Sequence, residues 1–276
     1  MDNAIIKMLR CPVCDAKMIA NDKLKLCHCM GQKAHSFDFS RSGYLNLGGA
    51  HAGEGDKKPA IIARRKFLDF GYYSDLSDKI NEILDSIPSK QVLDAGCGEG
   101  YYTNRMAQGR SVLGIDLSKD GIDYAARRAK QLSRTENVGF AVASVFNIPI
   151  SDAQMDAVVN IFAPCAEDEY CRVLKPSGYL LLVGAGEQHL MGLKRVLYEN
   201  PYTNQGRTDL PQKMSLIEKF RLQTEITVIG SEMIDALFSM TPYYWRTSMQ
   251  DRQKLTQLHA LTTELDFDIF LFRKDK

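Results

Sequence analysis

A glycine-rich turn that follows a short apolar strand is the feature that most constrains this fold. The segment Val92–Thr103, VLDAGCGEGYYT, is apolar up to Asp94 and then places Gly96, Gly98 and Gly100 ahead of a helix. Glycine lets the backbone pass close to a ligand where a Cβ would collide. In an open α/β sheet, such a ligand lies beyond the carboxyl ends of the strands. The segment therefore predicts an α/β fold with a ligand site at this strand end.

Helical and strand patterns alternate from about residue 60 onward. Apolar residues recur at helical spacing from Leu76 to Ile87 and stop before Pro88. Further helices are predicted just after the glycine turn, at 119–132, shortly before LKPSG and at 231–240. Strands are predicted at 91–96, 111–117, 138–144, 155–163, 178–186, 224–230 and 266–274. This alternation predicts a doubly wound, mainly parallel sheet of seven strands.

Two features separate the glycine turn from a dinucleotide site. The spacing GCGEG is not the GxGxxG that seats a pyrophosphate at a helix N-terminus. Asp116 ends the next strand, about 20 residues on, and is placed to hold two ribose hydroxyls. With the segment LKPSGYLLL, these features resemble class I (Rossmann-like) S-adenosylmethionine methyltransferases. We predict that Asp94, Gly96, Gly98 and Asp116 contact the cofactor.

The segment Ala141–Ile150 occupies the place where such enzymes contact the adenine of the cofactor. Ser144 and Val145 are the predicted adenine contacts. Each of these two residues, considered alone, is also typical of an ordinary loop or core position.

Residues 1–45 are cysteine-rich and contain too few apolar residues to form a stable core without a disulfide or a bound metal. Cys11-Pro-Val-Cys14 has the spacing of a zinc knuckle. Candidates for the second ligand pair are Cys27, His28, Cys29 and His35. We predict that Cys11, Cys14, Cys27 and His35 bind a structural Zn²⁺, with Cys29 as the rival of Cys27. A redox CxxC is the other interpretation, but such a motif normally follows a strand of a thioredoxin-like unit.

Three sections are predicted along the chain: a zinc-binding module at 1–45, a linker at 46–60 and a catalytic domain at 61–276. The linker contains GGAHAGEGDKK, which has four glycines and little to bury. Residues 1–70 carry twelve Lys and Arg against seven Asp and Glu, although the net charge of the chain is only +1. A basic front end suits a phosphate-rich partner or, equally, is a solvated face.

Compartment and membrane association follow from what the sequence lacks. No stretch reaches the roughly 18 apolar residues of a transmembrane helix. The first residues also lack the long apolar centre of a signal peptide. We therefore expect a cytoplasmic protein that does not associate with membranes. Because the cytosol keeps thiols reduced, the seven cysteines are interpreted as metal ligands and free thiols.

The order of these pieces resembles the RlmA-type 23S rRNA guanine-N1-methyltransferases over essentially the whole chain. The resemblance is carried by CPVC, HSFDFSRSGYLNL, ARRKFLDFGYYSDL, DAGCGEGYYT, NIFAPC, HLMGLK, MTPYYWR and DFDIFLF. It implies an enzyme that methylates N1 of one guanine in a 23S rRNA hairpin. It also implies a homodimer whose zinc modules recognise the RNA beside an RNA-sized cleft. By the same resemblance, the cofactor lies against Tyr73, Glu99, Gly100 and His189.

Two positions depart from the pattern of this family. The third and fourth zinc ligands of the family lie about four residues apart, as C-x-x-x-H, whereas Cys27 and His35 are eight apart. Pro59 occupies a position where an acidic residue is expected. The first departure leaves the choice of the third zinc ligand open.

The segment Asn160–Cys165 follows the fourth strand, where related nucleobase methyltransferases hold the target base. We predict that Asn160 hydrogen-bonds the base or the methyl donor. Phe162 is predicted to pack on a ring face, with a plain core position as the alternative. No residue stands out as the general base that the N1 proton requires. Cys165 is not expected to be a nucleophile, because methylation of a ring nitrogen needs no covalent adduct.

The aromatic run Tyr243-Tyr244-Trp245 stands beside Arg246. It could stack on RNA bases, but packing within a cap on the sheet is the favoured interpretation. Two other functions stay open for the whole chain. One is a small-molecule methyltransferase of an antibiotic pathway, which would work without residues 1–45. The other is a non-catalytic RNA-binding protein that senses the cofactor.

Overall fold

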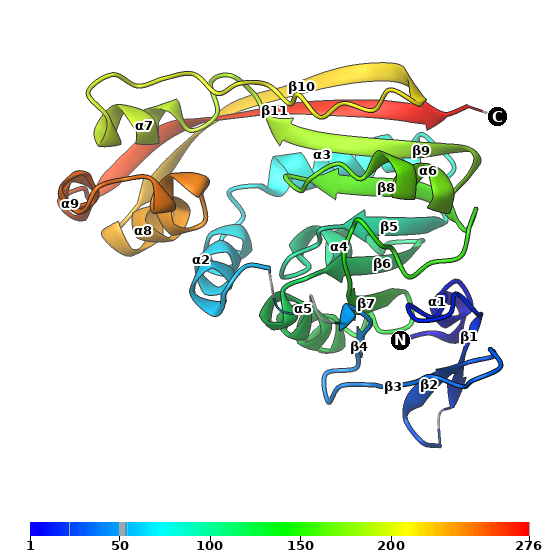
Figure 1. Ribbon diagram of the computed structural model, residues 1–276. Coiled ribbons are helices and arrows are strands. Elements are labelled where there is room, and N and C mark those ends of the chain that lie inside the picture. The colour runs from blue at the N-terminus through cyan, green and yellow to red at the C-terminus, as the bar shows by residue number, and fades with distance from the viewer. Residues whose placement is uncertain (22, 50–52, 54, 276) are drawn as a thin grey trace.

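The protein, described here by a computed structural model, forms one large sheet and a small sheet that is built from the N-terminal residues (Figure 1). The structure describes residues 1–21, 23–49, 53 and 55–275. The large sheet contains β4 (Leu45–Asn46), β5 (Gln91–Ala95), β6 (Ser111–Asp116), β7 (Val138–Val142), β8 (Met155–Ile161), β9 (Leu174–Ala185), β10 (Met214–Ile229) and β11 (Ala260–Lys274). The small sheet contains β1 (Met18–Asn21), β2 (Leu26–Cys29) and β3 (Ser36–Asp38).

Helices lie on both faces and at one end of the large sheet. They are α1 (Asn3–Ile6), α2 (Lys58–Asp69), α3 (Ser74–Asp85), α4 (Tyr101–Met106), α5 (Lys119–Gln131), α6 (Glu167–Val173), α7 (Met191–Leu197), α8 (Ser231–Ser239), α9 (Met249–Thr256) and the 3-10 helix η2 (Pro242–Trp245). The helical spacing predicted from Leu76 onward is confirmed by α3, which ends before Pro88. Among the described residues, no helix is long and apolar enough to cross a membrane.

The strand order of the large sheet is β10-β11-β9-β8-β5-β6-β7-β4. Neighbouring strands from β4 to β9 are parallel, and β11 runs antiparallel to both β9 and β10. The predicted doubly wound, mainly parallel sheet is thereby confirmed, but the predicted number of seven strands is wrong. The eighth strand, β4, pairs with β7 over two residues only. A two-residue strand is too short to give a periodic sequence pattern.

The last two strands are much longer than predicted. Strand β10 begins at Met214 instead of Thr224, and β11 begins at Ala260 instead of Asp266. Their hairpin extends past the rest of the sheet toward α7, α8 and α9 (Figure 1). Because β10 is an edge strand, most of its side chains are exposed, and most of the exposed ones are polar. An exposed strand of this kind lacks the apolar pattern used for prediction.

Two hydrophobic cores lie on opposite faces of the large sheet. Consecutive strand residues point to opposite faces, so Val92 joins the core beneath α2–α5 while Leu93 joins the other core. Ile5 and Leu9 of the N-terminal module belong to this second core. The module is thus packed directly against the catalytic sheet.

Backbone hydrogen bonds also attach the module to the loop after β7. The amide of Arg10 donates to the Pro149 carbonyl at 3.1 Å, and the amide of Ser151 donates to the Met8 carbonyl at 2.8 Å. Helix α2 begins at Lys58, inside the predicted linker 46–60. Residues 50–52 and 54 of that linker lie outside the described residues. The section boundaries stay predictions.

Candidate active site and metal cluster

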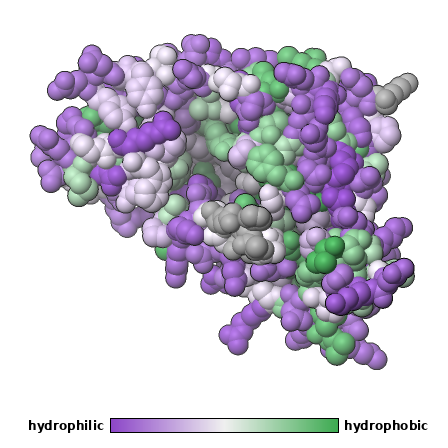
Figure 2. Space-filling view, in the orientation of Figure 1, coloured by the Kyte–Doolittle hydropathy of each residue, from purple (hydrophilic) through white to green (hydrophobic). Residues whose placement is uncertain are grey.

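A cavity of about 1380 Å³ opens at the carboxyl ends of the parallel strands. Figure 2 shows it as a hollow between the sheet and the α8–α9 lobe. Most residues predicted to bind the cofactor line it: Tyr73, Asp94, Gly96, Gly98, Glu99, Asp116, Ser144, Val145 and His189. Phe162 lines the same cavity, whereas Gly100 and Asn160 do not belong to its lining.

The glycine turn brings the backbone to the cavity because its residues adopt left-handed conformations. Gly96 has a φ of +85°, and a Cβ there would come within 2.5 Å of the Ala163 Cβ. Gly100 also has a positive φ, and its Cβ would come within 2.6 Å of the Ala125 Cβ. The close approach at Gly96 brings the glycine turn against the loop after β8, and both segments line the cavity. That at Gly100 packs the start of α4 against α5, so its cofactor contact stays a prediction.

Three carboxylates line one half of the cavity, where the cofactor is predicted to bind: Asp94 and Glu99 are buried, and Asp116 is partly buried. Asp94 accepts a hydrogen bond from Thr103 Oγ1 at 2.6 Å. Asp116 accepts from the amides of Gly98 at 3.0 Å and Ser118 at 2.7 Å. Burial raises the pKa of Asp94 to about 7, against the opposing effect of the Thr103 hydrogen bond.

Glu99 is the third carboxylate and is 4 % exposed. Among the residues that the structure describes, its Oε2 has no hydrogen-bond partner, and its ion pair with Arg64 Nη1 is long at 3.6 Å. Burial raises the pKa of Glu99 to about 7, although Arg64 opposes this effect. Buried carboxylates close together favour a cationic ligand, since a cation would relieve both burial and mutual repulsion. The sulfonium and amino groups of S-adenosylmethionine meet this requirement.

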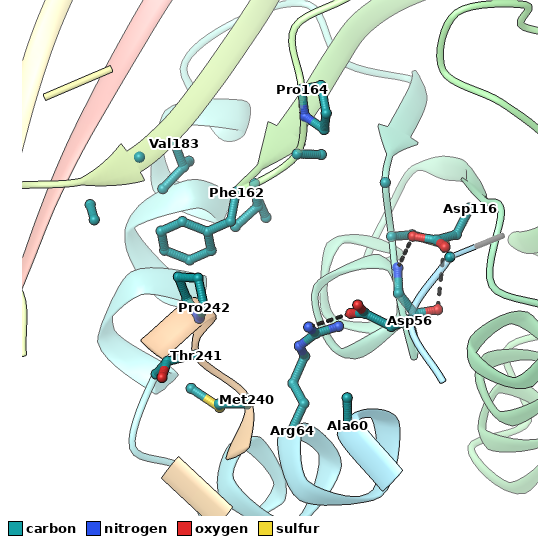
Figure 3. Close-up of a pocket in the computed structure, with 18 of the residues that line it drawn as sticks. Asp56, Ala60, Arg64, Asp116, Phe162, Pro164, Val183, Met240, Thr241 and Pro242 are labelled. Atoms are coloured by element: carbon teal, nitrogen blue, oxygen red, sulfur yellow. Dashed lines mark hydrogen bonds and ion pairs between the residues drawn. The ribbon is translucent and has the colours of Figure 1, made fainter. Parts of the chain in front are cut away.

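Arg64 of α2 was missed by the sequence analysis. Its Nη2 pairs with Asp56 Oδ2 at 2.5 Å (Figure 3). The Asp56 carbonyl accepts from Ser118 Oγ at 2.5 Å. These contacts hold the segment before α2 against the loop that follows β6. Within ARRKF, the basic residues could not be ranked from sequence because helix orientation decides which one faces the cavity.

Tyr73 and His189 meet across the cavity although 116 residues separate them. The Asp266 amide donates to His189 Nδ1 at 3.2 Å, and His189 Nε2 lies 3.2 Å from the Tyr73 hydroxyl. Burial lowers the pKa of His189 to about 4, so its ring is neutral. Because Nδ1 accepts, the proton sits on Nε2 and is donated to Tyr73. The Tyr73 hydroxyl hydrogen is thereby left for an anionic group in the cavity, such as a carboxylate.

The loop after β8 forms the wall of the other half of the cavity. Phe162 has a φ of +57° and is 48 % exposed, so it is not a plain core residue. Its ring centroid lies 6.3 Å from that of His189 and 6.0 Å from that of Phe267. Figure 3 shows the Phe162 ring facing Pro242. The predicted packing against a flat ligand therefore suits its position.

Asn160 is placed differently from its prediction. The side chain is fully buried, and its Nδ2 donates to the Pro164 carbonyl at 2.9 Å and to the Tyr170 hydroxyl at 2.7 Å. Its Oδ1 accepts from Arg207 Nη1 at 3.0 Å. Both amide hydrogens are thus used inside the protein. The arrangement fits a residue that holds the loop, and it gives no support to a hydrogen bond with the base.

Arg207 was not singled out from sequence, and it ties this loop to the following strand. Its side chain is 8 % exposed, and its Nη2 donates to the Ala163 carbonyl at 2.6 Å. Its Nη1 also reaches the Val183 carbonyl at 3.1 Å. Asp209 pairs with Arg207 Nε at 2.8 Å and accepts from the Cys165 amide at 3.0 Å. The guanidinium therefore holds the loop through the Ala163 carbonyl and the Asn160 side chain, which lie on either side of Phe162.

Replacing Arg207 by lysine is expected to lower kcat about 10- to 100-fold, because one ammonium cannot hold three carbonyl and amide oxygens in a fixed fork. The cofactor dissociation constant should change by a smaller factor than kcat, because Arg207 holds the Phe162 loop directly and reaches the glycine turn only through Ala163. Single-turnover methyl transfer and calorimetric titration measure the two quantities. Equal losses in both would contradict a positioning role.

Cys165 does not have the properties of a nucleophile. Burial raises its pKa to about 11, so the thiol is protonated at neutral pH. This supports the expectation that methyl transfer proceeds without a covalent adduct.

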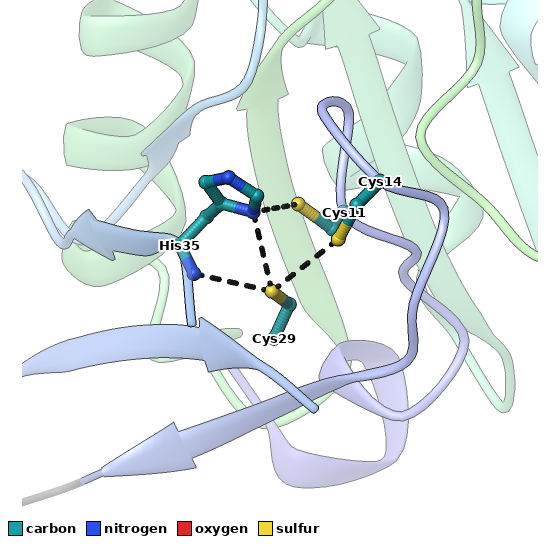
Figure 4. A group of neighbouring side chains, drawn as sticks. All are labelled: Cys11, Cys14, Cys29 and His35. Carbon is teal, nitrogen blue, oxygen red and sulfur yellow. Dashed lines mark hydrogen bonds between the residues drawn. The ribbon is translucent and has the colours of Figure 1, made fainter. Parts of the chain in front are cut away.

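Four side chains near the N-terminus gather into a candidate metal cluster: Cys11, Cys14, Cys29 and His35 (Figure 4). His35 Nδ1 lies 3.6 Å from Cys11 Sγ and 3.5 Å from Cys29 Sγ, and Cys14 Sγ lies 3.6 Å from Cys29 Sγ. Tetrahedral zinc with bonds of about 2.0–2.3 Å separates its ligand atoms by roughly 3.5–3.8 Å. Backbone N–H groups of His35 and Gly31 lower the pKa of the Cys29 thiol to about 6, which favours a thiolate ligand. The donor set is compatible with structural zinc.

The prediction of Cys27 as the third ligand is wrong for this cluster, which contains its rival Cys29. Pairing of β2 with β3 sets His28 opposite Ser36, so the chain returns with His35 beside Cys29. Their backbones are joined by a hydrogen bond from the Cys29 amide to the His35 carbonyl at 3.0 Å. Cys27 lies opposite Phe37 and packs in the hydrophobic core. Spacing alone could not show this register.

Comparison with known proteins agrees with the fold. Residues 87–229 match the family of methyltransferase domains. In fold, the chain resembles the crystal structure of YcgJ from Bacillus subtilis, with a TM-score of 0.50, 17% identity, and coverage of 72% of this chain and 98% of that one. The fold, the glycine turn and the acidic pocket thus define a class I S-adenosylmethionine-dependent methyltransferase.

Two relatives match over nearly the whole chain. YxjB of Bacillus subtilis (strain 168), named as a candidate 23S rRNA (guanine-N1)-methyltransferase, is 30% identical over 97% of both chains. The 23S rRNA (guanine(748)-N1)-methyltransferase of Streptomyces fradiae is 26% identical over 98% of both. The chain belongs to the family of 23S rRNA (guanine-N1)-methyltransferases.

Proposed function

We propose that this protein transfers a methyl group from S-adenosylmethionine to N1 of a guanine in a 23S rRNA hairpin. The observation that carries the proposal is one cavity with two unlike halves. Asp94, Glu99 and Asp116 make one half anionic, and Phe162 provides an aromatic wall in the other. Family membership supports the choice of guanine N1 as the acceptor.

S-adenosylmethionine supplies a methyl group on a sulfonium that is already reactive, so the chain mainly has to align and enclose the reactants. Asp116 would hold the ribose hydroxyls, and Asp94 and Glu99 would face the cationic amino acid part. The Tyr73 hydroxyl, oriented by His189, would donate to the cofactor carboxylate. Phe162 would stack on the guanine.

The N1 atom lies on the Watson–Crick edge, so the guanine must be unpaired before it reaches the cavity. We propose that the N-terminal zinc module holds the RNA while this happens. Its exposed cations support this role: Lys17, Lys23, Lys25, Lys33 and Arg41. A cytoplasmic homodimer with two such modules is part of the proposal.

Primer extension tests the proposed function directly. Because N1-methylguanine cannot pair, reverse transcriptase should stop beside one guanine of 23S rRNA from cells with the gene and read through it in cells without. Purified protein and labelled cofactor should restore the stop on unmodified rRNA. A small-molecule methyltransferase, or a protein that only senses the cofactor, would leave the two rRNAs alike. Deleting residues 1–45 is not a clean alternative test, since Ile5 and Leu9 belong to the core.

Cofactor affinity should rise with pH. The pKa values of Asp94 and Glu99 are raised to about 7, so both are largely neutral at pH 6 and largely ionised at pH 8. Ionised carboxylates attract the cationic cofactor, so calorimetry should show affinity about tenfold higher at pH 8 than at pH 6. The stability of the ligand-free protein should change in the opposite direction. Because folding raises the pKa of both carboxyl groups, they contribute to the free energy of unfolding at low pH, and this contribution is lost as the pH rises toward 7.

Glu99→Gln is the matched variant for this pH dependence, since it keeps the shape and removes one titrating group. Its affinity should be close to that of the native protein at pH 6 and clearly weaker at pH 8. An affinity of the native protein that does not vary between pH 6 and pH 8 would refute this role of the carboxylates.

A further inference from the structure

The aromatic run after α8 divides into two packed rings and one exposed ring. Tyr243 is 8 % exposed, and its hydroxyl donates to Asn204 Oδ1 at 2.9 Å. Tyr244 packs beside Phe238, with ring centroids 5.5 Å apart, and under the Arg252 guanidinium at 4.4 Å. The favoured prediction of packing thus describes Tyr243 and Tyr244. It does not describe Trp245, which is 78 % exposed.

The exposed indole contacts the Tyr244 ring and extends from a hydrogen-bonded turn. The Trp245 ring meets that of Tyr244 edge-on, with centroids 5.1 Å apart and an interplanar angle of 88°. The turn that carries Trp245 is closed by the amides of Arg246 and Thr247, which both donate to the Tyr243 carbonyl at 3.0 Å. A single exposed apolar residue is ordinary on a protein surface, so the location of this ring relative to the cavity decides what it can bind.

Trp245 also lines the cavity that Phe162 lines. Figure 3 shows Pro242, from the start of the same turn, facing the Phe162 ring. The cationic side chain of Arg246 lines the cavity next to the indole. An aromatic face with an adjacent cation is the usual combination for single-stranded nucleic acid, because bases stack on the ring and phosphates pair with the cation.

We propose that Trp245 is a stacking platform for the nucleobase next to the target guanine, with Arg246 against the adjoining phosphate. The inference rests on the proposed function and gives Trp245 and Arg246 a role in binding the RNA. Moving the guanine into the cavity removes a stacking partner from its neighbour. The indole at the rim replaces that partner and holds the RNA in its opened form.

The experiment uses the native fluorescence of the protein. Trp245 is the single tryptophan in the chain, so emission reports this position without any substitution. The full-length protein, saturated with S-adenosylmethionine, is titrated with the unmodified 23S rRNA hairpin. Emission should fall at least about twofold and saturate in step with binding measured by filter retention. Binding and methyl transfer with unchanged emission would overturn the inference while leaving the proposed function intact. Absence of both binding and transfer would overturn the proposed function, and the inference with it.

Variants test the energetic role of the ring. Trp245→Ala should raise the KM for the hairpin about 10- to 100-fold with cofactor affinity unchanged, and Trp245→Phe should recover most of the loss. Met249→Ala is the matched control, since Met249 is 72 % exposed but lies outside the cavity lining. Native KM in Trp245→Ala, or an equal loss in Met249→Ala, would overturn the proposal. Emission that follows protein concentration and sedimentation instead of RNA would assign the indole to a contact between two copies and also overturn it.

Discussion

Gly96→Ala is expected to weaken S-adenosylmethionine binding at least about tenfold and to lower turnover further. The φ of +85° is costly for alanine, by about 1–2 kcal/mol. The new Cβ would also meet the Ala163 Cβ at 2.5 Å, where neither backbone can easily move. Overpacking of this kind costs a further ~1–3 kcal/mol. Displacement of either loop would disturb the cofactor half and the Phe162 wall together.

Gly109→Ala is the matched control. Gly109 has a φ of +72°, similar to that of Gly96, but a Cβ there would meet no atom of the described part of the chain within 4 Å. Both variants therefore carry the same kind of backbone strain, and only Gly96→Ala adds the collision. Calorimetric titration and thermal melting of both proteins separate the two effects. If both variants bind the cofactor with native affinity, the contact between the glycine turn and Ala163 is not needed for cofactor binding.

Because Gly96 and Ala163 pack closely, a shift of the glycine turn is expected to shift the loop that carries Phe162, and the reverse. Ala163 touches the cofactor turn, and its carbonyl accepts from Arg207. The loop that carries Phe162 is thus set from one side by the glycine turn and from the other by a guanidinium. Small shifts in the reacting geometry have large effects on rate. The alignment of the acceptor therefore depends on residues far apart in the sequence.

The parts of the fold that could be predicted are those with a strong local signal. The strand before the glycine turn is buried on both faces, and its apolar run predicts it directly. The glycines are required by the backbone conformation of the turn itself. Such features depend on nearby residues only.

The parts that could not be predicted depend on pairing between distant segments. The role of Asn160 is set by Arg207, which lies 47 residues further along the chain. Residue type alone permits either a contact with a base or a contact with the loop. Strand β4 likewise exists only because β7 offers it a partner edge. Tertiary partners, which carry no local periodic signal, decided each of these cases.

The choice between Cys27 and Cys29 is of the same kind, and zinc content decides it. Cys29→Ala is expected to reduce bound zinc from about one ion per chain to less than about a tenth, because a four-ligand structural site is closed by each of its donors. Cys27→Ala should keep nearly all of the zinc. The two cysteines are matched, since both are buried in β2 and lie two residues apart.

Zinc loss should also destabilise the catalytic sheet, since Leu9 of the module packs in the same core as Leu93 and Leu113. Structural zinc contributes roughly 10 kcal/mol or more to small modules, so the melting temperature of Cys29→Ala should fall by at least about 5 °C. Adding a chelator to the native protein should lower its melting temperature similarly. Zinc retained by Cys29→Ala and lost by Cys27→Ala would reverse the assignment. Equal melting of native and zinc-free protein would instead show that the sheet holds the module without the metal.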